Sequence, residues 1–196
     1  PVTVSDKRSS KIIYKYVQSV GIPIVSEEEE KPSFEERNSA GEIWLIDPLD
    51  GTKEFIQKND EFCICIALIR KNKPVFGLIA APVSQEIILG GTEMGAYHFS
   101  YHEEDYLRKE NRQELKIPEQ KGLVFSRTHF SPKVQGIVEK IEKIHGPLNV
   151  IKKGSALKFF DLVLNRAQFY PRLAPTMEWD IAAGQAIYEA VGGEVI

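Results

Sequence analysis

Four apolar segments separated by turn residues occupy the middle of the chain and limit its possible folds most strongly. Residues 61–70 and 74–81 flank a turn at 71–73, which predicts a β-hairpin. Residues 85–89 and 95–99, with Gly90 and Gly91 between them, extend the hairpin into an antiparallel meander. Such a sheet has to bury its apolar face against helices, so we expect a layered protein.

Helix and strand patterns flank the meander on both sides. Before it, we expect helices over 11–20, ending at Gly21, and over 53–58, strands over 22–26 and 43–46, and a polar loop over 31–42. After it, we expect strands at 122–126, 150–151 and 168–170, and helices at 133–144, 155–164 and 177–191. This order predicts an α/β protein with an α+β lobe over 1–105 and an α/β lobe over 106–196, divided within the charged stretch 102–120.

The composition argues against several kinds of partner. A chain of 196 residues with 42% hydrophobic residues can bury a substantial core. A net charge of −3, without a basic stripe, disfavours a nucleic acid polymer as partner. The longest apolar run, residues 62–69, is far shorter than the roughly 20 residues that span a bilayer. We therefore expect a cytoplasmic protein, a monomer rather than a dimer, and a chain that is a piece of a longer protein.

Two cysteines, Cys63 and Cys65, lie two positions apart on one face of an expected strand. This spacing makes a poor disulfide, and two thiols alone make a poor metal site. We expect them to be reduced core residues, as is usual in the cytoplasm.

The segment 44–52, Trp-Leu-Ile-Asp-Pro-Leu-Asp-Gly-Thr, carries the clearest chemical signal. An apolar strand delivers Asp47 to its end, Pro48 is expected to stop the strand, and Asp50 follows one turn later. Two carboxylates and the Leu49 carbonyl suit a hard cation such as Mg²⁺. Gly51 permits a phosphate to approach closely, and the amides of Gly51 and Thr52 at a helix start could bind its oxygens.

A structural explanation competes for each part of this segment. Asp-Pro and Asp-Gly are common turn dipeptides, and Thr52 alone is a plausible helix N-cap. The strand, the two carboxylates and the helix start together favour a catalytic site. Phosphatases that form an aspartyl phosphate need two aspartates with one residue between them, and the Asp47-x-x-Asp50 spacing excludes that class.

Four short motifs resemble those of the inositol monophosphatase superfamily of lithium-sensitive, metal-dependent phosphatases. The first is Asp-Pro-Leu-Asp-Gly-Thr at 47–52, and the second is Glu-Trp-Asp-Ile-Ala-Ala-Gly at 178–184. Ser-Glu-Glu at 26–28 and Val-Thr-Val-Ser-Asp at 2–6 are similar to the other two. The resemblance implies a layered αβαβα sandwich of the inositol monophosphatase and fructose-1,6-bisphosphatase type, truncated at both ends.

Further motifs resemble the CysQ-type 3′(2′),5′-bisphosphate nucleotidases within that superfamily. They are Lys-Glu-Phe at 53–55, Ser-Arg-Thr-His at 126–129, Gly-Ser-Ala-Leu-Lys at 154–158 and Tyr-Pro-Arg at 170–172. Ala156 departs from the usual second serine of the third motif. The resemblance implies magnesium-dependent hydrolysis of 3′-phosphoadenosine 5′-phosphate, a small phosphorylated nucleotide, to AMP and phosphate. Inositol phosphate or fructose bisphosphate hydrolysis, or a non-catalytic binding role, are the alternatives.

The resemblance also implies a role for each motif residue, with two or three Mg²⁺ ions in the site. Asp47 would bridge two ions, with Glu27 and the Leu49 carbonyl on one, and Asp50 and Asp180 on the other. Thr52 and Asp6 would orient and deprotonate the attacking water. The nucleotide would contact Gly51, Thr52, His129, Ser155, Lys158 and Arg172.

Each of these roles has a simpler alternative. Asp180 would favourably face the positive end of its helix dipole, and Asp6 could be a surface acid. The basic residues could be ordinary surface charges. Glu28 is either a neighbour of the metal site or a solvated acid, and Glu29 and Glu30 are expected to be solvated.

Overall fold

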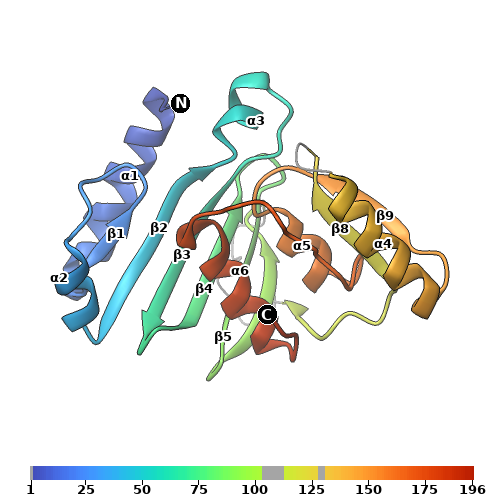
Figure 1. Ribbon diagram of the computed structural model, residues 1–196. Helices are drawn as coiled ribbons and strands as arrows, with labels where there is room; N and C mark the ends of the chain where they lie inside the picture. The colour runs from blue at the N-terminus through green and yellow to red at the C-terminus, as the bar shows by residue number, and fades with distance from the viewer. Residues whose placement is uncertain (1, 103–112, 128–130) are drawn as a thin grey trace.

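A seven-stranded sheet forms the centre of the computed structural model, which describes residues 2–102, 113–127 and 131–196 (Figure 1). Its strands lie in chain order and are antiparallel, apart from β1, which is parallel to β2. They are β1 (Ile24–Ser26), β2 (Glu42–Asp50), β3 (Cys63–Arg70), β4 (Lys73–Ala81), β5 (Glu86–Gly91), β6 (Gly95–Ser100) and β7 (Gln113–Glu114). The expected meander is confirmed. Its first turn has Lys71 and Asn72 at φ of 49° and 61°, a backbone that matches the twist of a tight hairpin.

The first helix begins earlier than the apolar spacing predicted. α1 spans Val4–Val17, is followed by a 3₁₀ turn, η1 (Gln18–Val20), and ends at Gly21 with φ of 76°. Thr3 and Asp6 form a capping box that starts the helix, so the prediction of a start at residue 11 was wrong. A second capping box, Ser33 with Glu36, starts α2 (Phe34–Ser39) where a loop was expected.

Strand β2 continues through Pro48, contrary to the prediction that Pro48 would end it. Asp47 pairs with Cys65 and Asp50 with Cys63, so β2 carries one extra residue at this point. This bulge accommodates a proline that has no amide hydrogen to donate. The helix that follows, α3 (Thr52–Gln57), has Gly51 as its N-cap, so the prediction of Thr52 as the cap was also wrong.

The C-terminal half adds a smaller parallel sheet and covering helices. β8 (Gly122–Ser126) pairs with β9 (Asn149–Lys153), and α4 (Pro132–His145) connects them. The expected strand at 168–170 is reduced to one bridge, between Leu123 and Phe169. α5 (Lys158–Val163) is shorter than predicted, and α6 (Glu178–Ala190) lies where a helix was expected.

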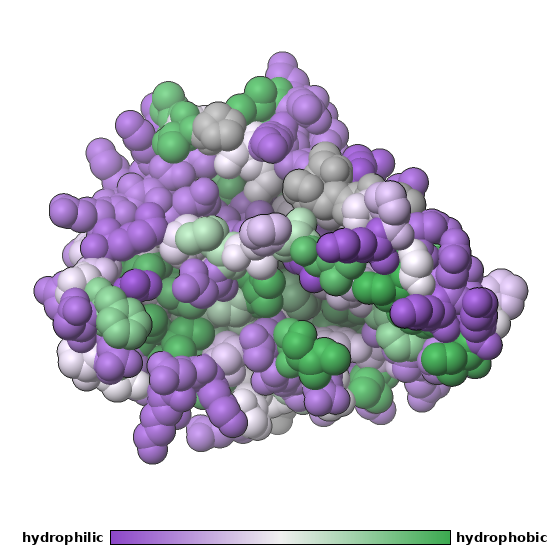
Figure 2. Space-filling model, in the orientation of Figure 1, coloured by the Kyte–Doolittle hydropathy of each residue, from purple (hydrophilic) through white to green (hydrophobic). Residues whose placement is uncertain are grey.

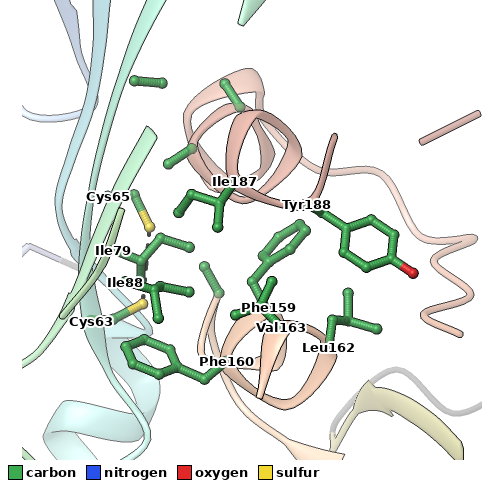
Figure 3. Packing of buried hydrophobic residues seen from close by; sticks show 14 of the residues in the cluster. Cys63, Cys65, Ile79, Ile88, Phe159, Phe160, Leu162, Val163, Ile187 and Tyr188 are labelled. Atoms are coloured by element: carbon green, nitrogen blue, oxygen red, sulfur yellow. Dashed lines mark hydrogen bonds between the residues drawn. The ribbon is translucent and has the colours of Figure 1, made fainter. Parts of the chain in front are cut away.

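The core lies between the large sheet and the helices α5 and α6. Cys63, Ile79 and Ile88 of the sheet face Phe160 and Ile187 of these helices (Figure 3). α6 lies so close to the sheet that a side chain on Gly77 would collide with the Ala183 carbonyl. The mixed α/β fold is confirmed, whereas the division into lobes at residue 105 stays a prediction.

A groove runs between α6 and the nearby edge of the large sheet. Hydrophobic side chains are visible in a hollow across the middle of the face that Figure 2 shows, where α6 lies in front of the sheet. Val25, Ile43, Leu45, Ile69 and Ile181 line the groove. Within the described residues, no helix combines the length and apolar character that a membrane span requires.

Candidate active site

Three aspartates from distant parts of the chain converge at the end of β2. Asp47 lies within the bulge, Asp50 is the last residue of the strand, and Asp180 lies in the first turn of α6. One carboxylate oxygen from each lies within 4.8 Å of the other two. Because like charges this close repel, the group needs either protons or a cation between its members.

Burial and mutual repulsion perturb the first two of these carboxyls strongly. Burial, helped by the charges of Asp50 and Glu27, raises the pKa of Asp47 to about 10. The amide of Leu49 donates to Asp47 Oδ1 at 2.9 Å and opposes that rise. Burial and Asp180 raise the pKa of Asp50 to about 6, while the Ala156 amide, Lys158 and Arg172 limit the shift. The cluster therefore favours a bound cation over three free negative charges.

Glu27 and Glu28 follow β1 and lie at the edge of this cluster. Partial burial raises the pKa of Glu27, its interaction with Asp47 opposes the rise, and the charges of Asp180 and Asp6 add to it. Glu28 is half-buried, and its pKa is raised by burial and by Asp6 and Glu27. Glu29 is exposed but accepts a hydrogen bond from the buried Ser10 hydroxyl at 2.8 Å, so it also stabilises α1.

Asp180 caps its helix and also belongs to the aspartate cluster. Its Oδ2 accepts the Thr176 hydroxyl at 2.6 Å and the Met177 amide at 3.2 Å, which starts α6. Both hydrogen bonds fall on one oxygen, so Oδ1 can face a cation in the cluster. Helix capping and metal binding are thus compatible at this residue.

Asp6 and Thr52 lie side by side although they come from different elements. The side chain of Asp6 is buried, with the residue 1% exposed, so its interpretation as a surface acid was wrong. Thr3 donates both its amide, at 2.7 Å, and its hydroxyl to Asp6 Oδ2. Thr52 Oγ1 lies 3.4 Å from Asp6 Oδ1 and 3.3 Å from the Leu49 carbonyl oxygen, either of which can accept its hydrogen.

Gly51 is required by the packing around it. Its φ is 93°, in the left-handed region, and an added side chain would lie 2.9 Å from the Glu61 carbonyl oxygen and 3.0 Å from Ser155 Cβ. Glycine relieves both constraints at the start of α3. The backbone of the segment 154–156 can therefore approach the end of β2.

The pocket next to the aspartates is lined by two positively charged side chains that were predicted to contact the substrate. Asp50, Asp180, Ser155, Lys158 and Arg172 all line it, together with Tyr170. Lys158 is buried, and its Nζ donates to the carbonyls of Ser155 and, at 3.4 Å, Lys153, so it also holds this loop. Burial lowers the pKa of Lys158, and Asp50 opposes that effect.

Of these two positively charged side chains, Arg172 has hydrogen-bond donors left for a ligand. Its Nη1 donates to the Tyr170 hydroxyl at 3.3 Å, and its buried Nε has no partner among the described residues. Ser155 has φ of 47° and its Oγ accepts the Leu157 amide at 3.2 Å. His129 lies outside the described residues.

Several supporting residues were missed by the sequence reasoning. The Ala156 amide donates to Asp50 Oδ2, and Glu61 accepts the Gly154 amide at 2.7 Å and two hydrogen bonds from Arg127. Thr3 could have been found, because Thr-x-x-Asp matches a capping box. Nothing local to Glu61 signals a partner 93 positions away.

Comparison with known proteins determines the class of this chain. Residues 1–196 all match the inositol monophosphatase family. The chain belongs to that family. The predicted resemblance is thereby confirmed, and membership in this family assigns the chain to the phosphatases, which are hydrolases.

Relatives within the inositol monophosphatase family are nucleotidases by name. The chain is 36% identical over 197 residues to the 3′(2′),5′-bisphosphate nucleotidase CysQ of Salmonella typhimurium, covering 100% of this chain and 75% of that protein. The CysQ of Haemophilus influenzae is 31% identical, with 100% and 71% covered. The crystal structure of CysQ from Bacteroides thetaiotaomicron matches with a TM-score of 0.85 at 34% identity, over 95% of this chain and 72% of that one.

The donor set of this site suits a hard divalent cation. Asp47, Asp50 and Asp180 offer carboxylate oxygens within 4.8 Å of one another, and the Leu49 carbonyl lies beside them in the chain. Magnesium prefers oxygen ligands and keeps several waters, so three clustered carboxylates, two of which line the pocket, fit it.

Proposed function

We propose that this chain hydrolyses 3′-phosphoadenosine 5′-phosphate to AMP and phosphate, with two or three magnesium ions in the carboxylate cluster. The observation that carries the proposal is that one pocket is lined both by the carboxylates Asp50 and Asp180 and by the cations Lys158 and Arg172. A nucleotide with two phosphates needs both kinds of site. The names of the relatives that are 31–36% identical support the same substrate.

The carboxylates beside the pocket would hold, through magnesium, the phosphate that is cut. Asp47, Asp50, Asp180, Glu27 and the Leu49 carbonyl are the proposed magnesium ligands. Magnesium bound there would lower the pKa of water and neutralise negative charge on the phosphoryl oxygens. The amides of Gly51 and Thr52 lie at the start of α3 and would donate to those oxygens.

Thr52 would orient the attacking water, and Asp6 would accept its proton. Thr52 Oγ1 can donate to Asp6 Oδ1, so its lone pairs are free to accept a hydrogen from the water and orient it. Asp6 Oδ2 is occupied by Thr3, which leaves Oδ1 as the oxygen that receives the proton. The resulting step is direct displacement by water, without a covalent intermediate.

The cationic side chains of the pocket would hold the phosphate that is retained. Arg172 has an unpartnered buried Nε among the described residues, and a guanidinium can bind a phosphate with two hydrogen bonds. Lys158 adds positive charge and orders the loop that carries Ser155. His129 is the remaining proposed contact to the nucleotide.

A panel of phosphate monoesters tests this function. Because the chain spans 75% of the Salmonella relative, the assay uses the complete gene product. We expect the highest kcat/KM with 3′-phosphoadenosine 5′-phosphate in magnesium and no turnover in EDTA. A higher kcat/KM with inositol monophosphate or fructose 1,6-bisphosphate would refute the nucleotidase assignment and keep the phosphatase one.

A further inference from the structure

Two buried thiols that have no role in the proposed hydrolysis lie beside one of its carboxylates. Cys63 and Cys65 are 0% and 1% exposed, and their sulfurs face each other 3.9 Å apart (Figure 3). Cys63 Sγ lies 3.7 Å from Asp50 Oδ2. One ligand atom from each of the three residues lies within 4.8 Å of the other two, so Asp50 belongs to this group as well as to the aspartate cluster.

Two of the distances in this group, Cys63 Sγ to Cys65 Sγ and Cys63 Sγ to Asp50 Oδ2, match the edges of a tetrahedral metal site. Zinc bonds are about 2.3 Å to thiolate and about 2.1 Å to carboxylate. Tetrahedral angles then separate two thiolates by about 3.8 Å, and a thiolate and a carboxylate oxygen by about 3.6 Å. The observed 3.9 Å and 3.7 Å agree within the tolerance expected of a metal site.

We propose that Cys63, Cys65 and Asp50 form a second cation site, which takes a thiophilic divalent ion such as Zn²⁺ or Cd²⁺. Thiolates select such soft ions, whereas Mg²⁺ prefers oxygen. Each thiol loses its Sγ proton to solvent as the metal–sulfur bond forms, so binding releases two protons and involves no oxidation. Ser155 Oγ, 3.5 Å from Cys63 Sγ, is near enough to supply a fourth ligand or to hold a water.

The second site would regulate the first one through the shared carboxylate. Asp50 Oδ2 already accepts the Ala156 amide and lies toward Cys63, so a soft ion there would compete with magnesium for the negative charge of this carboxylate. The apolar core, including Ile79, Ile88 and Phe160, packs around the thiols (Figure 3), so an ion would enter from the Asp50 side. We expect inhibition that added magnesium relieves only in part, a consequence that rests on the proposed function.

Cadmium titration tests the site without any need for activity. The protein in excess magnesium is titrated with Cd²⁺ while the thiolate-to-cadmium charge-transfer band in the ultraviolet is followed. The chain has only two cysteines, so within this chain the band reports on Cys63 and Cys65. One equivalent should give the full band, and Cys65→Ala should weaken cadmium binding by about 100-fold or more. Asp50→Asn, which keeps both thiols, should weaken it less.

Inhibition is then measured on the same variants. Cys65→Ala should keep the magnesium-dependent activity of the parent and resist zinc and cadmium. Cys63→Ala serves as the second variant if Cys65→Ala fails to fold, because it removes a ligand at a different core position. A missing band at saturating cadmium, or equal inhibition of parent and variants, would overturn the proposal. A parent that shows the band but no nucleotidase activity would refute the proposed function alone.

Discussion

Thr52 Oγ1 lies 3.4 Å from Asp6 Oδ1, although the two residues are 46 positions apart in the chain. Asp6 cannot turn away, because Thr3 holds its Oδ2 with an amide and a hydroxyl. Thr52 is fixed in turn by the start of α3. A buried carboxylate held in this way makes the Thr52 hydroxyl a well-oriented acceptor for a water hydrogen.

The first prediction separates this pair from the metal ligands. Thr52→Ala should lower kcat by about 10²–10⁴-fold, the usual contribution of general acid–base catalysis. Magnesium affinity, measured by titration calorimetry, should change little because Thr52 touches the water and not the ions. Thr52→Ser is the matched control and should retain most of the activity. A large loss of magnesium affinity in Thr52→Ala would contradict the assigned role.

The second prediction concerns magnesium and stability. Asp47, Asp50 and Asp180 repel one another in the metal-free protein, so a cation that binds only the folded state should raise Tm. At a free magnesium concentration 100 times Kd, the expected gain in unfolding free energy is about 2.7 kcal/mol. Asp47→Asn should abolish both activity and the magnesium-dependent rise in Tm. If neither Tm nor turnover changed on addition of magnesium or EDTA, the metal assignment would be wrong.

The third prediction is the pH dependence of the metal-free protein. The folded-state pKa values of Asp47 and Asp50, about 10 and about 6, lie above the ordinary 3.8. A raised pKa means that the folded state binds the proton more tightly than the unfolded state does. This proton binding therefore adds its full contribution to the unfolding free energy below about pH 4, and the contribution is lost as pH rises. In EDTA, unfolding free energy should fall from pH 5 to pH 8, with Asp47 contributing at most about 1.4 kcal/mol per pH unit.

Chemical denaturation across that pH range, with and without magnesium, measures the effect. Magnesium replaces the protons, so it should reduce the fall in unfolding free energy between pH 5 and pH 8. Asp47→Asn should flatten the metal-free curve because it carries no titrating group at this position. A metal-free protein that became more stable over this range would contradict the buried, mutually repelling carboxyls.

The fourth prediction concerns a loop anchor that sequence reasoning missed. Glu61 accepts hydrogen bonds from the Gly154 amide and from Arg127, and these partners keep its pKa below the ordinary value despite the opposing effect of burial. Glu61→Gln should destabilise the protein by about 1 kcal/mol, since the pair with Arg127 is partly exposed. It should also raise KM more than it lowers kcat, because the loop carries substrate contacts.

Arg127→Lys is the partner variant for this anchor. Lysine keeps the charge but cannot make the two parallel hydrogen bonds of a guanidinium, so KM should rise by a smaller factor. Unchanged KM in both variants would mean that the loop holds its position without Glu61.

The sequence predicted the elements of the sheet and the residues of the cluster for different physical reasons. Alternating apolar residues and turn residues are local signals, and they located the β3–β4 hairpin. The local segment 44–52 indicated Asp47 and Asp50, whereas the approach of Asp180 is not local and only the family motifs indicated it. The α1 start was missed because the first turns carry few apolar residues, whereas the Thr3–Asp6 capping box was available as a signal.

What could not be predicted depends on contacts between distant segments. Pro48 was expected to end β2, but the bulge opposite Cys63 and Cys65 accommodates it. Two thiols alone predict no metal site, and the proximity of Cys63 Sγ to Asp50 Oδ2 depends on how β2 and β3 pair. Lys158 was expected only as a nucleotide contact, yet its Nζ is bound to backbone carbonyls that the sequence cannot place.

The last prediction concerns the choice of substrate. The aspartate cluster can recognise only the phosphate that is cut, so discrimination must come from groups that contact the rest of the molecule. Arg172 is the best candidate, because its Nε is buried without a partner among the described residues. A charge-assisted hydrogen bond contributes about 1.5–3 kcal/mol, or about one to two orders of magnitude in affinity. Arg172→Ala should lower kcat/KM for 3′-phosphoadenosine 5′-phosphate by that factor.

A substrate with a single phosphate separates recognition from catalysis in this test. It offers nothing for Arg172 to bind, so its kcat/KM should barely change in Arg172→Ala. Arg172→Lys is the matched control, because lysine keeps the positive charge but lacks the planar set of donors of a guanidinium. It should restore part of the kcat/KM that Arg172→Ala loses for the bisphosphate. Equal slowing of both substrates by Arg172→Ala would mean that Arg172 supports the reacting phosphate or the fold, because a retained-phosphate contact cannot affect a substrate that lacks that phosphate.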